Sequence, residues 1–183
     1  MNFKNRFFNK WRIDSGNTIS ISSSVRMKKC SISIKGQGNY LRIAEDAILR
    51  EVNLEIVGEN CSLEIGSSTI IGHGCYLSVK ERGISLSIGS HANLSRNVRI
   101  MCADGHDIMQ ENQRINPAKS IKIGDRVWLA DSAVILKGIT IGNDAIIGIQ
   151  SVVTQDIPDG CIAAGNPARI VKEEISNRWE HTW

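Results

Sequence analysis

One segment of the chain carries a histidine among carboxylates and amides, a combination suited to proton transfer. Residues 102–119 read CADGHDIMQENQRINPAK, with His106 between Asp104 and Asp107. An imidazole has an ordinary pKa near ~6.5 and can take a proton at neutral pH, and a neighbouring carboxylate can orient its ring. We therefore expect His106 to be a general base, with Asp104 or Asp107 as its orienting partner. A lone histidine in a loop is otherwise a solvated surface residue, so the surrounding elements must decide.

The other three histidines point less clearly to chemistry. His73 follows an aliphatic repeat position by two residues, and we expect it to line a groove for the acceptor substrate. His91 and His181 are interpreted as surface residues. A catalytic zinc site requires several convergent ligands. No two histidines here have the close spacing of a metal-binding pair, so we expect no metal.

The composition indicates a soluble globular chain. The 183 residues are 42% hydrophobic and 22% charged, and the formal net charge of +3 is too small to indicate a nucleic-acid-binding protein. No segment has the ~20 consecutive apolar residues of a membrane span, and the start of the chain lacks the apolar run of a signal peptide. Five scattered cysteines without a CxxC pair favour reduced thiols in a cytoplasmic protein.

The elements that must position His106 repeat every six residues. A longer motif marks each new turn, as LRIAEDA, LEIGSST, LSIGSHA, IKIGDRV and ITIGNDA from residues 41, 63, 86, 121 and 139. Neither an α-helix nor a β-hairpin repeats with this period. The repeat predicts an all-β parallel β-helix, a triangular coil in which each inward aliphatic stacks on the next turn. Counting in sixes from Ile123 gives only aliphatic residues: Leu129, Ile135, Ile141, Ile147 and Val153.

The spacing of these motifs locates the loops. Three units make 18 residues, but the isoleucines Ile43, Ile65, Ile88, Ile123 and Ile141 are 22, 23, 35 and 18 residues apart. The surplus of 17 residues before Ile123 is the segment around His106, so we expect a protruding loop over about 101–120. Long ordered loops on rigid scaffolds commonly carry function, which favours the catalytic interpretation of His106.

The residue before each inward aliphatic should face outward. One such row is polar, whereas two rows contain apolar residues, which commonly form subunit interfaces. We therefore expect these two faces to be covered by other copies of the chain or, at Trp128, by a ligand. The polar row is Glu64, Ser87, Lys122 and Thr140; the apolar residues are Ile70, Trp128 and Ile146 in one row and Tyr76, Val134 and Val152 in the other.

Residues 123–172, IGDRVWLADSAVILKGITIGNDAIIGIQSVVTQDIPDGCIAAGNPARIVK, resemble the C-terminal signature of the hexapeptide-repeat acyltransferases. The segment is similar to that of galactoside, maltose, xenobiotic and O-antigen O-acetyltransferases. The resemblance implies a left-handed coil, a homotrimer, and acetyl-CoA bound in the groove between neighbouring subunits.

The resemblance also implies roles for individual residues. It makes His106 the general base and places Trp128 against the pantetheine arm or the acceptor. It assigns the adenine end and phosphates of CoA to Asn166, Pro167, Arg169 and Lys172. Further positions on the expected path of the coenzyme are Ala130, Asp131, Ile149 and Thr154. We expect a backbone N–H near Ala130 to stabilise the oxyanion.

The two ends depart from the repeat. Residues 1–18 are expected to form an amphipathic segment, in which Phe3, Phe7 and Trp11 with basic neighbours over 3–12 either cap the first coil or contact a membrane surface. The coil is expected over 19–158. The repeat stops after Pro158, and 159–183 are expected to form a loop and a short C-terminal helix within 170–181.

Together these features predict a cytoplasmic O-acetyltransferase that uses acetyl-CoA to acetylate a hydroxyl of a sugar or surface polysaccharide, with no nucleic-acid partner. Three alternatives remain open: an N-acetyltransferase acting on an amino sugar, a zinc enzyme like the γ-class carbonic anhydrases, and a non-enzymatic scaffold.

Overall fold

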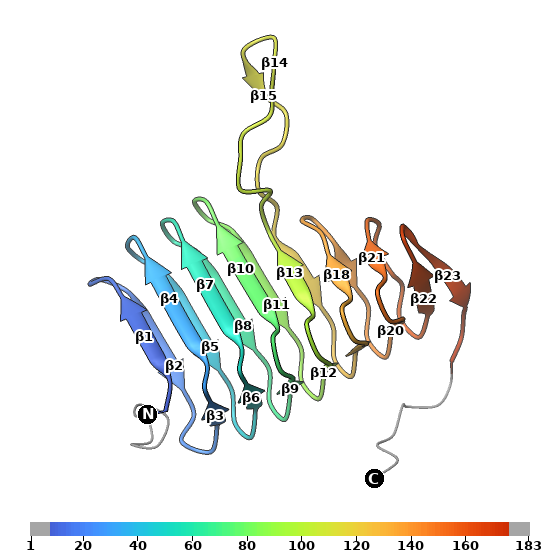
Figure 1. Ribbon diagram of the computed structural model, residues 1–183, viewed down its shortest axis with the longest axis horizontal. Helices are drawn as coiled ribbons and strands as arrows, with labels where there is room; N and C mark the ends of the chain where they lie inside the picture. Colours follow the sequence, from blue (N-terminus) through green and yellow to red (C-terminus); the bar gives the residue numbers. More distant parts are fainter. Residues whose placement is uncertain (1–7, 176–183) are drawn as a thin grey trace.

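The computed structural model describes residues 8–175, which form a parallel β-helix of about 7 turns, as the repeat predicts, with the left hand that the resemblance implies (Figure 1). Successive strands enter three parallel sheets in rotation, named here A, B and C in chain order. The segments that join the sheets are the A–B, B–C and C–A corners of a triangular prism.

The strands are short and stack turn upon turn within the described residues. Sheet A contains β1 (Lys10–Ile13), β4 (Ser31–Lys35), β7 (Asn53–Val57), β10 (Tyr76–Lys80), β13 (Arg99–Met101), β18 (Val134–Ile135) and β21 (Val152–Val153). Sheet B contains β2 (Thr18–Ile21), β5 (Tyr40–Ile43), β8 (Ser62–Ile65), β11 (Ser85–Ile88), β16 (Ile121–Ile123) and β19 (Thr140–Ile141). Sheet C contains β3 (Arg26–Lys28), β6 (Ile48–Arg50), β9 (Ile70–Ile71), β12 (Asn93–Leu94), β17 (Trp128–Leu129), β20 (Ile146–Ile147), β22 (Ile162–Gly165) and β23 (Ala168–Lys172).

The strand register confirms the inward and outward rows expected from the sequence. On sheet C, Asn93 pairs with Ile70 on one side and with Trp128 on the other, and Trp128 pairs with Ile146. On sheet A, the outward row from Tyr76 reaches Val152 in the same way. The inward aliphatics form one continuous core, and every member of the six-residue series 123–153 is at most 2% exposed.

The glycine of the repeat motif is required by the close stacking of the B–C corners. A Cβ on Gly66 would lie 2.5 Å from the carbonyl carbon of Gly89 in the next turn, and one on Gly89 would lie 2.5 Å from that of Gly124. The polar residue that follows closes the neighbouring corner, because the Oδ1 of Asp125 accepts the N–H of Ser90 at 2.7 Å. The motif thus encodes the spacing between turns.

All five cysteines are free and buried, as expected for small core residues. Burial raises the pKa of Cys75 to about 11 and that of Cys102 to about 12. These two thiols therefore stay protonated at neutral pH and serve packing.

The stacked strands extend beyond the expected limits of 19–158. β1 already pairs with β4, and β22 continues sheet C by pairing in parallel with β20. Trp11 lies on β1 and packs against the core, so residues 10–13 belong to the first turn of the coil. Residues 3–7 of the expected amphipathic stripe, including Phe3 and Phe7, lie outside the described residues.

The expected C-terminal helix is wrong as far as residue 175. The chain instead turns back after Gly165, and β23 pairs antiparallel with β22. This pairing satisfies backbone groups at the edge of the last strand, which would otherwise stay open. The remainder of the expected helix, residues 176–183, lies outside the described part. No helix among residues 8–175 is long and apolar enough to cross a membrane.

Candidate active site

The long loop leaves the coil at the A–B corner between β13 and β16, where the sequence predicts it. Residues 102–120 are named here the hairpin arm, because they contain the antiparallel strands β14 (Met109–Gln110) and β15 (Gln113–Arg114). Figure 1 shows the arm projecting from the coil. A hydrogen bond from Lys119 N to Cys102 O, 2.9 Å long, closes its base.

Asn116 holds the arm in shape around His106. It is 7% exposed, and its Nδ2 donates to the carboxylate of Asp104 and to the carbonyl of His106, both at 2.8 Å. Its Oδ1 accepts the N–H of Ile108 at 2.6 Å. One buried amide therefore fixes the backbone on both sides of the histidine.

Ion pairs fasten the arm to the coil. Lys137, from the A–B corner of the following turn, pairs with Asp104 and donates to the carbonyl of Asn116 at 2.9 Å. Arg114 pairs with Glu81 of the preceding turn, with one Nη–Oε distance of 2.8 Å. The hydrogen bonds from Lys137 and then Asn116 hold the pKa of Asp104 below its usual range, and Arg114 does the same for the pKa of Glu81.

His106 is exposed on this fastened arm. The two carboxylates expected to orient it are engaged elsewhere: Asp104 with Lys137, and Asp107 with the Nε of Arg114 at 2.8 Å. Among the described residues no hydrogen bond reaches its imidazole. The structure therefore positions the backbone of the histidine and leaves its ring open to a substrate.

The expected coenzyme residues lie mainly on sheet C and the C–A corner. Trp128 is half-buried on β17 and donates from Nε1 to Ser95 Oγ at 3.0 Å. Ile149, at the last C–A corner before the coil ends at β22, is 66% exposed. Asn166 and Pro167 form the exposed turn between β22 and β23, and β23 carries the exposed cations Arg169 and Lys172.

Two of the expected coenzyme contacts are already occupied within the chain. The N–H of Ala130 donates to Ile147 O at 2.9 Å as part of the ladder between turns, so it is not available for an oxyanion. Asp131 accepts the backbone N–H of Arg96 at 2.9 Å and its Nε at 3.0 Å, and these bonds lower the pKa of Asp131. The expectation of an oxyanion donor at Ala130 is thus not supported by the hydrogen bonding.

The candidate residues occupy two different corners of the prism. His106 and Thr154 belong to the A–B corner, Thr154 following β21. Ala130, Asp131 and Ile149 belong to the C–A corner, and Trp128 to the neighbouring sheet C. Sheet A separates these groups within one chain. A single copy therefore does not bring the proposed base and the proposed coenzyme residues into one site.

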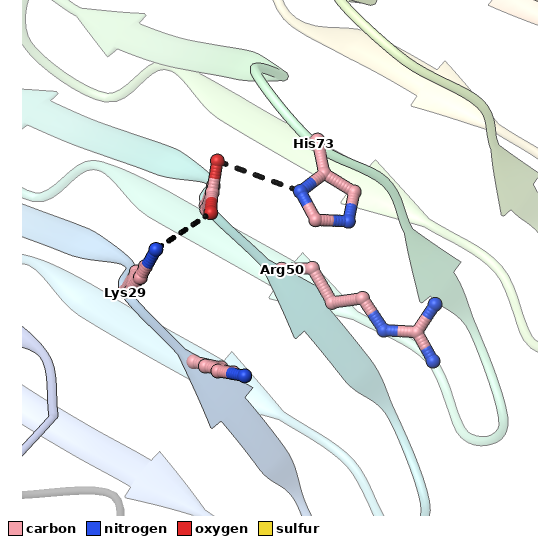
Figure 2. A pocket seen from close by; sticks show the side chains of 5 residues that line it. Lys29, Arg50 and His73 are labelled. Atoms are coloured by element: carbon pink, nitrogen blue, oxygen red, sulfur yellow. Dashed lines mark hydrogen bonds and ion pairs between the residues drawn. The ribbon is translucent and has the colours of Figure 1, made fainter.

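His73 lies at the C–A corner, as part of an open pocket of about 280 Å³ (Figure 2). Its Nδ1 is 3.5 Å from the carboxylate of Glu51, which also contacts Lys29 at 3.4 Å. Lys28 and Arg50 complete the lining. Within residues 8–175, no group of three or more His, Cys, Asp or Glu side chains is arranged to hold a metal ion.

Comparison with known proteins relates this fold to one enzyme family. Residues 120–155 match the family model described as bacterial transferase hexapeptide (six repeats). The chain is 32% identical over 147 residues to the galactoside O-acetyltransferase of Escherichia coli K12, and the match covers 74% of this chain and 71% of that enzyme. The chain belongs to the hexapeptide-repeat acetyltransferases. This acetyltransferase spans 44% to 58% of the length of some other curated relatives.

Solved structures agree with the family assignment. The crystal structure of the polySia-specific acetyltransferase NeuO has a TM-score of 0.76 and 28% identity, covering 95% of this chain and 83% of that one. The acetyltransferase VCA0836 of Vibrio cholerae, solved with acetyl coenzyme A, has a TM-score of 0.55 and 25% identity, covering 74% and 70% of the two chains.

Sequence reasoning missed the residues that fasten the hairpin arm. Lys137 and Asp104 are 33 residues apart, as are Arg114 and Glu81. No local pattern links such positions. The cations of the pocket at His73 could have been found from the sequence. Lys28 and Arg50 are 22 residues apart, which is the length of one N-terminal turn, so their side-by-side position in neighbouring turns was predictable.

Proposed function

We propose that this acetyltransferase moves the acetyl group of acetyl-CoA to a hydroxyl of a sugar, free or within a surface polysaccharide. The observation that carries the proposal is the exposed His106, which Asn116 holds on an arm of the coil, in a fold similar to that of the acetyltransferase NeuO. The names of relatives support the acceptor class, since one acts on galactosides and another is specific for polySia. The buried free cysteines favour a reducing compartment, and we propose the cytoplasm.

His106 would act as the general base. Its neutral imidazole takes the proton of the acceptor hydroxyl as the oxygen attacks the thioester carbonyl. The new C–O bond forms, the C–S bond breaks, and the proton passes from the imidazolium to the leaving sulfur. Holding both substrates in one groove lowers the entropic part of the barrier. The oxyanion donor must be a group other than the N–H of Ala130, which is bonded to Ile147.

The coenzyme would lie along the C-terminal turns. Arg169 and Lys172 extend from β23 as exposed cations suited to phosphates, beside the turn at Asn166 and Pro167. Trp128 and the exposed Ile149 offer apolar surface along sheet C and the C–A corner. This arrangement suits a ligand with a charged end and an apolar arm.

The proposed site requires a second copy of the chain, and we propose a homotrimer. The hairpin arm and the coenzyme residues stand on different corners, so the arm of one copy must approach sheet C of another. The arm exposes apolar side chains that such a contact would cover, with Ile108, Met109 and Ile115 between 52% and 57% exposed. The apolar outward rows of sheets A and C are further candidate contacts.

Acetyl transfer is tested by following thiol release from acetyl-CoA with sugars and polysaccharides as acceptors. We expect release that depends on the acceptor and a product with an ester-linked acetyl group. An amide product on an amino sugar would instead support the N-acetyltransferase alternative. Absence of CoA binding by calorimetry would support the scaffold alternative.

The shared site is tested by mixing two inactive variants. His106→Ala lacks the base and Trp128→Ala lacks the apolar contact, so each alone should be impaired. After dissociation and reassembly together, some sites combine an intact arm with an intact sheet C, and activity should partly return. No recovery, or a monomer by light scattering at micromolar concentration, would contradict the shared site.

A further inference from the structure

The pocket at the C–A corner of the N-terminal turns is dominated by cations. It has a volume of about 280 Å³ and is lined by Lys28, Lys29, Arg50, Glu51 and His73 (Figure 2). This volume is near the lower end of the ~300–1,000 Å³ typical of ligand pockets, enough for a group of sugar size. Three of the five lining residues are permanent cations and only one is a carboxylate.

The single carboxylate is already used by two of its neighbours. Glu51 contacts Lys29 at 3.4 Å and His73 at 3.5 Å, the contacts drawn as dashed lines in Figure 2. The hydrogen bond with His73 is the largest cause that lowers the pKa of Glu51, followed by that with Lys29. Glu51 thus remains charged at neutral pH and orients the side of the pocket formed by Lys29 and His73.

Lys28 and Arg50 form the other side without such a partner. They are directly opposite each other in the register of β3 and β6, and both are exposed. Neither makes an ion pair with a carboxylate among residues 8–175. In Figure 2 the guanidinium of Arg50 takes part in none of the marked contacts. Like charges directly opposite on neighbouring strands are unfavourable, so this pair is best accommodated by an external anion.

The pocket is continuous with the row that carries the coenzyme residues. Backbone hydrogen bonds link the C–A corners in order, from Glu51 to Gly74, His73 to Asn97, Arg96 to Ser132 and Asp131 to Gln150. The corner of Glu51 is thus three turns from that of Asp131. With neighbouring strands ~4.8 Å apart, that separation is about 15 Å along the coil. A single sugar cannot extend over this length, but a polymer can.

We propose that this pocket binds a carboxylate-bearing residue of an acidic polysaccharide, several residues away from the sugar that is acetylated. The inference rests on the proposed function and specifies its acceptor as an anionic polymer. Lys28 and Arg50 bind the carboxylate, Glu51 holds Lys29 and His73 in place, and the chain of the polymer follows the C–A corner towards Trp128. Binding at the pocket fixes the register of the polymer and does not take part in the chemistry.

The test measures binding of a polysialic acid oligomer to the full chain without acetyl-CoA, so that it does not depend on turnover. The matched probe is the same oligomer with its carboxylates reduced to alcohols, and inorganic phosphate serves as a small competing anion. The variant is Lys28→Gln with Arg50→Gln. Its control, Lys35→Gln with Lys122→Gln, removes two exposed cations from sheets A and B and so matches the change in net charge.

We expect the pocket variant to weaken binding of the acidic oligomer roughly tenfold, as for the loss of two exposed charge contacts. The control variant should bind like the wild type, and the reduced oligomer should bind weakly to all three proteins. In the transfer assay, the pocket variant should raise KM for the polymer while kcat stays nearly constant.

Several results would overturn the inference. The wild type could fail to bind the acidic oligomer, or the pocket variant could bind it as tightly as the wild type does. The wild type could also bind the reduced oligomer as tightly as the acidic one, or inorganic phosphate could displace the oligomer at concentrations as low as those at which the oligomer itself binds. If acetyl transfer to the polymer is the same for the wild type and the pocket variant, the proposed function stands and the pocket inference is wrong. If binding of the oligomer requires Lys28 and Arg50 but no acetyl group is transferred, the pocket inference stands and the proposed function is wrong.

Discussion

The A–B corner is closed in two different ways along the coil. In the N-terminal turns the neutral side-chain amides of Asn17 and the buried Asn39 hydrogen-bond across it from turn to turn. Asn39 is 1% exposed, its Nδ2 donates to Gly58 O at 2.9 Å, and its Oδ1 accepts the N–H of Cys61 at 2.9 Å. Its own N–H donates to Asn17 Oδ1 at 2.9 Å, so the asparagines form a ladder from turn to turn.

Between β13 and β16 the same corner opens into the hairpin arm, and charged pairs near the surface hold it. The side chain of Asp104 is 44% exposed and that of Glu81 is 32% exposed. Only Asn116 continues the use of a buried amide. Exposed ion pairs contribute little to stability, so this segment is held less strongly than the coil below it.

The stacked core of the coil is independent of the length of its A–B corner. The inward residues keep their stacking whether the A–B corner is short, as between β18 and β19, or carries the whole arm. Corner length can therefore vary without disturbing the coil, and the histidine proposed as the general base lies on the longest corner. Changes in the arm should affect rate, and changes in the amide ladder should affect stability.

The largest expected effect comes from His106→Ala. Loss of a general base typically slows a reaction by ~10²–10⁴-fold, and kcat should fall by about this factor. CoA affinity should change little, because the base acts mainly on the transition state. The melting temperature should also change little, because the side chain is exposed and has no hydrogen bond within the described chain. Steady-state kinetics and thermal melts measure both.

The matched control is His91→Asn, which changes an exposed histidine at a B–C corner. Its φ of 58° is tolerated by asparagine, so the fold should persist. Near-normal turnover of His106→Ala would show that another group takes the proton, and a large loss in His91→Asn would show that the assay reports something other than the arm.

The second effect concerns the amide ladder. Asn39→Ala leaves the N–H of Cys61 without its acceptor, and the carbonyl of Gly58 loses a donor. Leaving such buried groups unpaired costs about 1–3 kcal/mol, so the free energy of unfolding should fall by this amount while kcat is nearly unchanged. Denaturant titration with a parallel activity assay provides the measurement. Asn53→Ala, on the exposed side of β7, is the control and should be close to neutral.

A loss of activity in Asn39→Ala with unaltered stability would contradict this division of roles, because it would mean that the N-terminal corners act on the chemistry. If Asn53→Ala lowers the free energy of unfolding as much as Asn39→Ala does, the buried hydrogen bonds of Asn39 contribute no more to stability than those of an exposed side chain.

The sequence predicted the coil and the arm because both depend on simple spacing. The series from Ile123 to Val153 keeps its six-residue phase, and the surplus before Ile123 can only leave the coil. The first strand, β1, was placed outside the coil because the N-terminal turns are four to five residues longer than three units, which breaks the six-residue phase there.

The details of the site depend on contacts that spacing does not encode. The pairing of Asp104 with Lys137 joins positions from different turns, so the sequence pattern alone offered Asp104 or Asp107 as the partner of the nearer His106. The engagement of the Ala130 N–H follows from its place in a parallel ladder, where each turn bonds to the next. The predicted fold implies that this N–H is bonded, but only once the strand register between neighbouring turns is known.

The smallest expected effect is a pH dependence confined to the arm. The pKa values of Asp104 and Glu81 are lowered by Lys137 and Arg114, so their pairing stabilises the docked arm above the ordinary carboxyl pKa. That contribution is lost as the pH falls through the lowered values, below roughly pH 4. Each exposed pair contributes up to about 1 kcal/mol, so the loss should be modest. The asparagine ladder has no titrating group and should not respond.

Hydrogen exchange can separate the two corners at the level of single amides. Protection factors, corrected for the intrinsic effect of pH, should fall on acidification for Ile108 and Lys119 in the arm but not for Cys61 in the ladder. Asp104→Asn removes the charge that Lys137 binds, so the arm of this variant should be less protected at neutral pH and less sensitive to acid. Equal loss of protection at Cys61 would indicate global acid unfolding. An arm that keeps full protection at pH 3 would show that Asn116 and the hairpin strands hold it without the ion pairs.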